Sequence, residues 1–159
     1  MMWNNPIRLL IVDDRLPARE GLRALLSVIG DSDEQHQYPP ILVVGEACDG
    51  TQAIKMVQEL HPDVVLMDVR MPGLSGLETT RLLRESWPDI QIILMSFYGV
   101  HRVEALETGA NSFLLKGCSP EELLDTILMA KFGKQPRHSG CLEECTLAGK
   151  TTKEKTYGK

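Results

Sequence analysis

The sequence contains no long hydrophobic run and little cysteine. None of its apolar stretches approaches the roughly 20 residues that a membrane-spanning helix needs. The first six residues also lack the basic and apolar regions of a signal peptide. We therefore expect a cytoplasmic protein with no membrane span. In that setting the four cysteines are more typical of free thiols than of a disulfide framework. Cys141 and Cys145 could begin a zinc site, but a second pair with metal-ligand spacing is missing.

Clustered basic charge is also missing from most of the chain. Residues 1–132 hold 11 basic and 19 acidic side chains, a net charge of −8, whereas residues 133–159 hold 6 basic and 3 acidic ones, a net charge of +3. Nucleic-acid phosphates are bound by clustered Lys and Arg, so we do not expect this chain to bind DNA directly. The length fits one domain over residues 1–132, followed by a tail over 133–159 that we expect to be a linker or disordered.

Apolar runs alternate with amphipathic segments between residues 7 and 131, which is typical of strand–helix units around a parallel sheet. Several runs are continuous in Val, Ile and Leu, as expected of strands covered on both faces. The expected strands are 7–12, 41–47, 63–67, 90–95 and 112–115. The expected helices are 16–29, 50–60, 75–85, 100–107 and 120–130. Ser119, Pro120 and Glu122 form a capping-box pattern at the start of the last helix, and the polar stretch 31–40 is expected to be a surface loop.

Polar residues follow four of these strands at the point where each strand ends. Ligands bind at the carboxyl ends of the strands in doubly wound sheets, so these positions are the informative ones. They are occupied by Asp13 and Asp14, Asp68, Ser96, and Lys116. The four histidines are scattered, none follows a strand, and we assign them no catalytic role.

Three carboxylates that meet at one end of a sheet would repel one another unless a cation lies between them. A hard divalent ion such as Mg²⁺ prefers oxygen ligands and commonly bridges carboxylates to a phosphate. Lys116 would add a compact positive charge for phosphoryl oxygens, and Ser96 a hydroxyl donor. The set therefore predicts phosphoryl transfer to an aspartate.

These residues lie in segments that resemble the response-regulator receivers of two-component systems, of which CheY is the small stand-alone example. The resemblance covers residues 7–131, and its wording is closest to receivers of NarL/LuxR-type transcription regulators. The segments that carry it are IRLLIVDDRLPAREGLRALL, VVGEACDGTQAI, PDVVLMDVRMPGLSGLE and GANSFLLKGCSPEELL. The resemblance implies a flavodoxin-like (CheY-like) α/β fold, a doubly wound five-stranded parallel sheet in the order 2-1-3-4-5 with five flanking helices.

The resemblance also implies a role for each matching position. Asp68 matches the phospho-acceptor and Lys116 the lysine that pairs with it. Asp13 and Asp14 match the acidic metal-binding pair, and with Asp68 and the backbone carbonyl of Arg70 they would hold Mg²⁺, for which Mn²⁺ could substitute. Ser96 matches the switch hydroxyl, and Phe113 matches the aromatic residue whose ring changes position on activation.

A sensor histidine kinase is the phosphoryl donor that the resemblance implies. Such a receiver catalyses only its own phosphorylation and dephosphorylation, so we do not expect an enzyme in the usual sense. Its output would be transcription regulation through a longer parent protein, with DNA contacted by a C-terminal helix-turn-helix that this chain does not show. A homodimer formed on phosphorylation is a further expectation.

Three features depart from the common family pattern: Phe97 and Tyr98 follow the switch hydroxyl, Gly117 follows the lysine where many members have proline, and the 31–40 loop is long. Two other functions stay open. A pseudo-receiver would keep the fold as an interaction module without phosphorylation. A phosphatase with an aspartyl nucleophile commonly has a second Asp two residues on, where this chain has Arg70.

Overall fold

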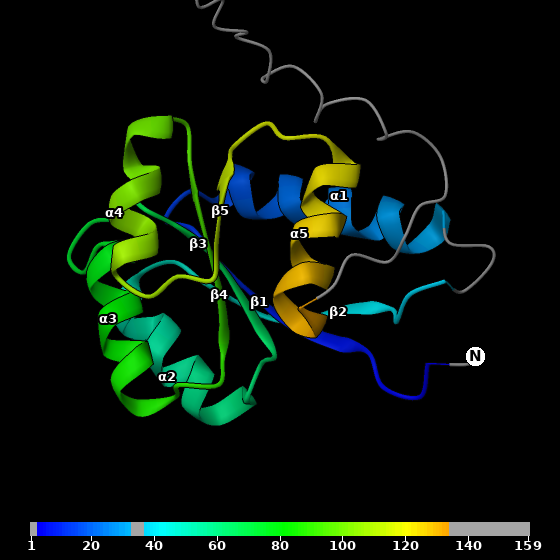
Figure 1. Cartoon of the computed structure of the whole chain (residues 1–159), viewed down its shortest axis with the longest axis horizontal. Helices are drawn as coiled ribbons and strands as arrows, with labels where there is room; N and C mark the ends of the chain where they lie inside the picture. The colour runs from blue at the N-terminus through cyan, green and yellow to red at the C-terminus, as the bar shows by residue number, and fades with distance from the viewer. Residues whose placement is uncertain (1–2, 33–36, 134–159) are drawn as a thin grey trace, which may run out of the picture.

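The computed structural model describes residues 3–32 and 37–133, which form a parallel sheet covered by helices on both faces (Figure 1). The strands are β1 (Ile7–Val12), β2 (Ile41–Ala47), β3 (Val64–Asp68), β4 (Gln91–Ser96) and β5 (Ser112–Leu115). All neighbouring strands are parallel, and their spatial order is β2-β1-β3-β4-β5. The expected doubly wound sheet and its order 2-1-3-4-5 are therefore confirmed.

In the described residues, four α-helices connect the strands and a fifth follows β5, and the five divide between the two faces of the sheet. They are α1 (Leu16–Ser32), α2 (Gly50–Leu60), α3 (Gly76–Ser86), α4 (Arg102–Glu107) and α5 (Pro120–Phe132). Helices α1 and α5 pack together on one face, and α2, α3 and α4 cover the other (Figure 1). Within the described ranges, none of these helices combines the length and the apolar character needed to cross a membrane.

The core consists of two apolar layers because successive side chains of each strand point to opposite faces. On β1, Leu10 and Val12 belong to the layer beneath α2, α3 and α4, whereas Leu9 and Ile11 belong to the layer beneath α1 and α5. All four side chains are at most 1% exposed. Burial on both faces explains why the strands were visible as continuous apolar runs. Truncating one such side chain to alanine costs about 2–5 kcal/mol of stability.

Most predicted boundaries agree with the structure to within two residues, and the first and fourth helices show the larger differences. Helix α1 continues through Ser32, so the first two residues of the expected loop 31–40 are helical; no proline stops the helix before Pro39. The expected helix 100–107 begins instead as a 3-10 turn, η1 (Gly99–His101), which leads into α4. Helix α5 starts at Pro120 with Ser119 as its cap, as expected, but the reciprocal capping box lies at Ser75 and Glu78 of α3.

Most of the expected tail, residues 134–159, lies outside the described residues, as do Cys141, Cys145 and residues 33–36. The prediction of a linker or disordered segment there stays a prediction. The two cysteines that the structure describes, Cys48 and Cys118, are free thiols.

The amino ends of the strands hold a closed polar network around Asp63, the residue before β3. The Asp63 carboxylate accepts hydrogen bonds from the Arg8 backbone N–H at 2.9 Å and from Lys131 Nζ at 2.7 Å. Burial by itself would raise the pKa of Asp63, but the hydrogen bonds and charges of Lys131 and Arg8 outweigh it and lower the pKa below its ordinary value of 3.8. At this end of the sheet a carboxylate is fully paired.

Candidate functional site

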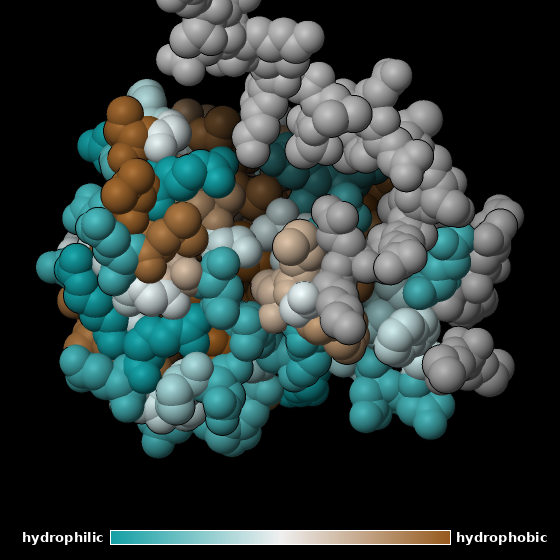
Figure 2. All heavy atoms as spheres, viewed as in Figure 1, coloured by the Kyte–Doolittle hydropathy of each residue, from teal (hydrophilic) through white to brown (hydrophobic). Residues whose placement is uncertain are grey.

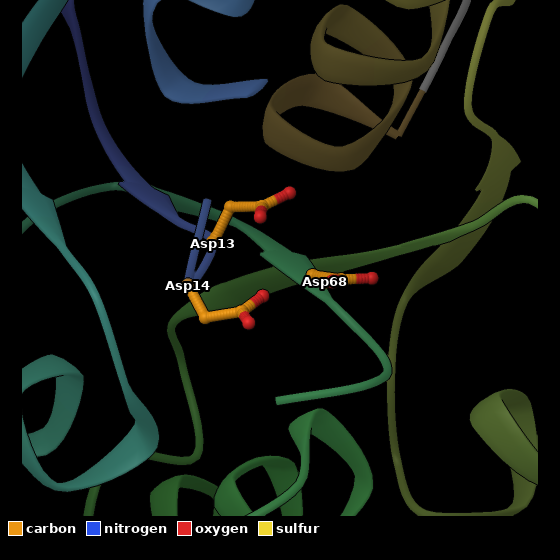
Figure 3. Close-up of side chains that lie close together, drawn as sticks. All are labelled: Asp13, Asp14 and Asp68. Carbon is orange, nitrogen blue, oxygen red and sulfur yellow. The ribbon is translucent and has the colours of Figure 1, made fainter. Parts of the chain in front are cut away.

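The carboxyl ends of β1 and β3 bring three aspartates together (Figure 3). The two strands are neighbours in the sheet, with Val12 paired with Met67. Asp13 and Asp68 come next on each strand, and Asp14 follows directly. One carboxylate oxygen from each aspartate lies within 4.8 Å of the others. This place is the reversal point of the strand order, where doubly wound sheets bind their ligands.

The chain packs closely behind Asp68 because of a glycine at the start of α3. Gly76 donates its N–H to the Val69 carbonyl at 2.8 Å. A Cβ at position 76 would collide with the backbone carbonyl oxygen of Asp68. Because Gly76 has no side chain, α3 can begin directly against the end of β3, where Asp68 lies.

The three aspartates differ in exposure, so they differ in what they can do. Asp13 and Asp68 are 1% and 7% exposed, whereas Asp14 is exposed. Asp13 also accepts a hydrogen bond from the Arg15 backbone N–H at 3.0 Å, which fixes its carboxylate. The arrangement presents two anchored carboxylates and one that solvent can reach.

Lys116 is the cation that contacts two of these aspartates. It follows β5, and its Nζ lies 2.5 Å from Asp13 Oδ2 and 3.2 Å from Asp68 Oδ2. Gly117, directly after it, has a φ of +88°, a conformation that favours glycine and lets the chain turn away behind the lysine. Lys116 is thus held at the end of β5 with its ammonium group among the carboxylates.

Lys116 does not offset all of the local negative charge. Burial raises the pKa of Asp68 above its ordinary value of 3.8, and the charge of Asp13 adds to this, although Lys116 and a hydrogen bond from the Arg70 backbone N–H act in the opposite direction. Carboxylate oxygens in this density suit a hard divalent cation. The cluster therefore fits a metal ion on the chemistry of its donors.

Ser96 ends β4 and is 2% exposed. Its Oγ accepts a hydrogen bond from the Tyr98 backbone N–H at 3.1 Å and lies 2.7 Å from Nδ1 of His101. None of the histidines directly follows a strand, so the strand-end pattern assigned no role to any of them. His101 lies five residues beyond Ser96, and the 3-10 turn brings it back. The five-residue spacing between Ser96 and His101 indicates a contact only if a 3-10 turn is expected between them.

Phe113, on β5, is 5% exposed, and the Arg102 guanidinium lies over its ring at 5.2 Å from the ring centre. Phe97 is 59% exposed and carries two cations near its ring, with Arg15 and Lys116 each 5.2 Å from the ring centre. Lys116 therefore lies between the Phe97 ring and the acidic cluster, because its ammonium group is near both. Phe97 does not close over the cluster from a buried position.

Comparison with known proteins identifies the family. Residues 9–128 match the response regulator receiver domain. The chain belongs to the response regulator receiver family. This receiver is 37% identical over 136 residues to the nitrate/nitrite response regulator protein NarL of Escherichia coli (strain K12), covering 84% of this chain and 59% of NarL. It is 39% identical over 121 residues to the transcriptional regulatory protein YdfI of Bacillus subtilis (strain 168), covering 76% and 53%.

A solved structure agrees with the receiver assignment. The signal receiver domain of NarL from Mycobacterium tuberculosis is 31% identical and aligns with a TM-score of 0.71, covering 82% of this chain and 99% of that domain. The expected resemblance to NarL/LuxR-type receivers is confirmed. The chain spans between 53% and 59% of the length of the two curated relatives.

The structure brings Asp13, Asp14, Asp68 and Lys116 into one cluster, as the strand-end rule predicted. Arg70 follows β3 by two residues, and its side chain is exposed. The chemical roles of these residues, and those of Ser96 and Phe113, stay predictions.

Proposed function

We propose that this receiver takes a phosphoryl group onto Asp68 and changes its surface in response. The observation that supports the proposal most is the pairing of a buried aspartate with Lys116 at 3.2 Å, beside two further carboxylates within 4.8 Å. A carboxylate whose pKa is raised, in a cluster with excess negative charge, is typical of a functional site.

The acidic cluster would hold Mg²⁺ through Asp13, Asp14, Asp68 and the backbone carbonyl of Arg70, and Mn²⁺ could substitute. The ion would offset negative charge on the phosphoryl oxygens. The exposure of Asp14 supports this role, because a ligand that solvent can reach permits the ion to exchange.

The residues of the chain supply the acceptor and its surroundings. A carboxylate oxygen of Asp68 attacks the phosphorus of a phosphohistidine on a sensor histidine kinase; the new P–O bond forms as the P–N bond breaks, and the histidine leaves with the bonding electrons. Lys116 contacts Asp68 and offers its ammonium group to the transferred oxygens. The protein therefore acts on its own aspartate and is not an enzyme for other substrates.

The partner would approach next to the cluster. A cavity of about 240 Å³ opens there, and its lining joins Lys116 and Phe97 to apolar residues of α1, Leu22 and Leu25. An apolar hollow beside a charged site suits a partner helix that presents a phosphohistidine. Phe97 borders this entrance, so we expect Phe97→Ala to change the rate of phosphorylation more than its final extent.

The response would pass through the two buried residues next to the site. Ser96 would turn its hydroxyl toward the phosphoryl oxygens, and Phe113 would move into the space behind it. Both residues adjoin η1 and α4, whose apolar residues Val100, Val103 and Leu106 are 83%, 67% and 46% exposed. Figure 2 shows apolar side chains gathered on the α4 side of the molecule.

We further propose that the output is transcription regulation by a longer protein of which this chain is the receiver. A helix-turn-helix after the receiver would contact DNA, in the cytoplasm, and the receiver itself would not. The exposed apolar residues of η1 and α4 support a homodimer that forms on phosphorylation. Light scattering with and without beryllofluoride tests the dimer; an unchanged monomer mass in both conditions would contradict it.

Intact mass after incubation with Mg²⁺ and acetyl phosphate tests the central proposal. We expect one added phosphoryl group on the wild type and none on Asp68→Asn. The matched control is Asp63→Asn, which alters the aspartate at the opposite end of β3 that is also paired with a lysine. It should accept phosphate like the wild type.

Two outcomes would replace the proposal. A wild type that gains no phosphoryl mass and binds no beryllofluoride is a pseudo-receiver that serves as an interaction module. Release of inorganic phosphate from an added phosphate monoester, abolished by Asp68→Asn, would instead indicate an aspartyl phosphatase that acts on other substrates.

A further inference from the structure

Two consecutive residues before and at the start of α4 contact the two buried residues of the proposed switch. His101 Nδ1 lies 2.7 Å from Ser96 Oγ, and the Arg102 guanidinium lies 5.2 Å from the centre of the Phe113 ring. Ser96 and Phe113 are 2% and 5% exposed, whereas His101 is half-buried and Arg102 exposed. The start of α4 thus reaches from the surface to both switch residues.

The hydrogen bonds around Ser96 restrict what its hydroxyl can do. A serine hydroxyl carries one hydrogen and can accept from other donors. The Tyr98 backbone N–H already donates to Oγ. If Nδ1 is the unprotonated nitrogen of a neutral His101, Ser96 donates its one hydrogen to the imidazole. A hydroxyl in that bond has no hydrogen left for a phosphoryl oxygen.

We propose that His101 is a positioning residue that holds the hydroxyl of Ser96 and competes for it with the phosphoryl group on Asp68. This inference rests on the proposed function. Ser96 donates either to Nδ1 of His101 or to the phosphoryl group, and not to both. His101 therefore sets how readily the switch responds once Asp68 is modified.

The competition also links the switch to α4. Neither η1 nor α4 has a side-chain hydrogen bond at its N-cap, and the ring of His101, the α4 N-cap residue, is bonded to Ser96. When Ser96 turns to the phosphoryl group, His101 loses this bond. The contact between Arg102 and Phe113 is one residue away, so release of His101 also affects the residue that covers the Phe113 ring.

Binding of beryllofluoride in the presence of Mg²⁺, followed by amide NMR, tests the competition. His101→Ala should bind this phosphoryl mimic about three- to tenfold more tightly than the wild type, because a typical hydrogen bond no longer has to be given up. The matched control is His61→Asn at the opposite end of the sheet. His61 has a φ of +47°, which asparagine tolerates. It should bind the mimic like the wild type.

A double-mutant cycle separates positioning from a general structural effect. In the Ser96→Ala background, His101→Ala should leave beryllofluoride affinity unchanged, because no hydroxyl remains to be held. His101→Asn places an amide oxygen near the position of Nδ1 and should restore most of the wild-type affinity. An effect of His101→Ala that persists without Ser96, or that asparagine does not reverse, would overturn the proposal.

The ¹⁵N resonances of the imidazole give a measurement that needs no phosphoryl mimic. Nδ1 of His101 should report an unprotonated nitrogen that accepts a hydrogen bond, and Ser96→Ala should shift this resonance. If the wild type binds beryllofluoride as tightly as His101→Ala does, the competition for Ser96 is contradicted and the proposed function is not. Wild type and variants that all fail to bind it overturn the proposed function, and the competition with it, whatever the imidazole reports.

Discussion

Strand β3 has an aspartate at each end, and the two aspartates have opposite surroundings. Asp63, before the strand, accepts hydrogen bonds from a backbone N–H and from Lys131, and its pKa is lowered. Asp68, at the end of the strand, shares Lys116 with Asp13, and its pKa is raised. Negative charge is thus paired with positive charge at one end of the sheet, around Asp63, and is in excess at the other, around Asp68.

The difference teaches where this fold keeps its chemistry. A carboxylate such as that of Asp63, whose oxygens already accept hydrogen bonds from the protein, can stabilise the fold without a bound cation. Carboxylates that share one lysine keep an unfavourable energy that a cation or a change of charge can relieve. The excess charge at the carboxyl ends of the strands is therefore a property of the site, and the paired charge at the amino ends is a property of the scaffold.

Metal binding should produce the largest separation between the two ends. Saturating Mg²⁺ at ~100 times its dissociation constant stabilises a folded protein by about 2.7 kcal/mol. Thermal unfolding measures this stabilisation. We expect Mg²⁺ to raise the unfolding temperature of the wild type and of Asp63→Asn, and to raise that of Asp13→Asn little or not at all. Equal stabilisation of all three proteins would mean that the ion binds elsewhere.

Removing charge at the site should stabilise the protein when divalent ions are absent. In EDTA, Asp68→Asn removes the cost of burying a carboxylate and its repulsion with Asp13, and we expect a gain of about 1 kcal/mol in the free energy of unfolding. Urea denaturation measures it. A loss of stability of similar size would show that the contact of Asp68 with Lys116 outweighs the repulsion.

Asp63→Asn should have the opposite sign. The variant loses the ion pair with Lys131, which links β3 to α5, and we expect a loss of about 1 kcal/mol in the same urea experiment. Lys131→Met tests the same pair from its other side. If the two single variants and the double variant are equally destabilised, the pair accounts for the loss.

The pH dependence of the Asp63 effect should be the smallest signal. Its folded pKa lies below 3.8, so its contribution is fully present above the unfolded value and is lost as pH falls through the folded pKa. The stability difference between wild type and Asp63→Asn should therefore shrink below pH 3.8 and stay constant above it. A difference that grows on acidification would reverse the assigned direction of the pKa shift.

The fold was predictable because its central strands β1, β3 and β4 are buried on both faces. Apolar-rich segments such as Ile7–Val12 and Ile41–Ala47 gave strand positions that the structure confirms. Strand-end positions then indicated Asp13, Asp68 and Lys116, because parallel strands end on one side of a sheet. These inferences need no knowledge of side-chain conformation.

The remaining features depend on local geometry that sequence patterns do not specify. His101 reaches Ser96 through a 3-10 turn, which the helical pattern over 100–107 hid. The end of α1 was placed too early because Gly30 weakens the helical pattern without ending the helix. Phe97 was visible in the sequence only as a departure from the family pattern, and its position beside Arg15 and Lys116 depends on side-chain conformations that the pattern does not specify.

The ion pair between Asp63 and Lys131 also determines where the last described turn is attached. Lys131 lies in the last turn of α5, two residues before Gly133, where the described part of the chain ends. The pair joins that turn to the residue before β3, at the opposite end of the strand from Asp68. The last turn of α5 is therefore attached to the paired end of the sheet, away from the acidic cluster.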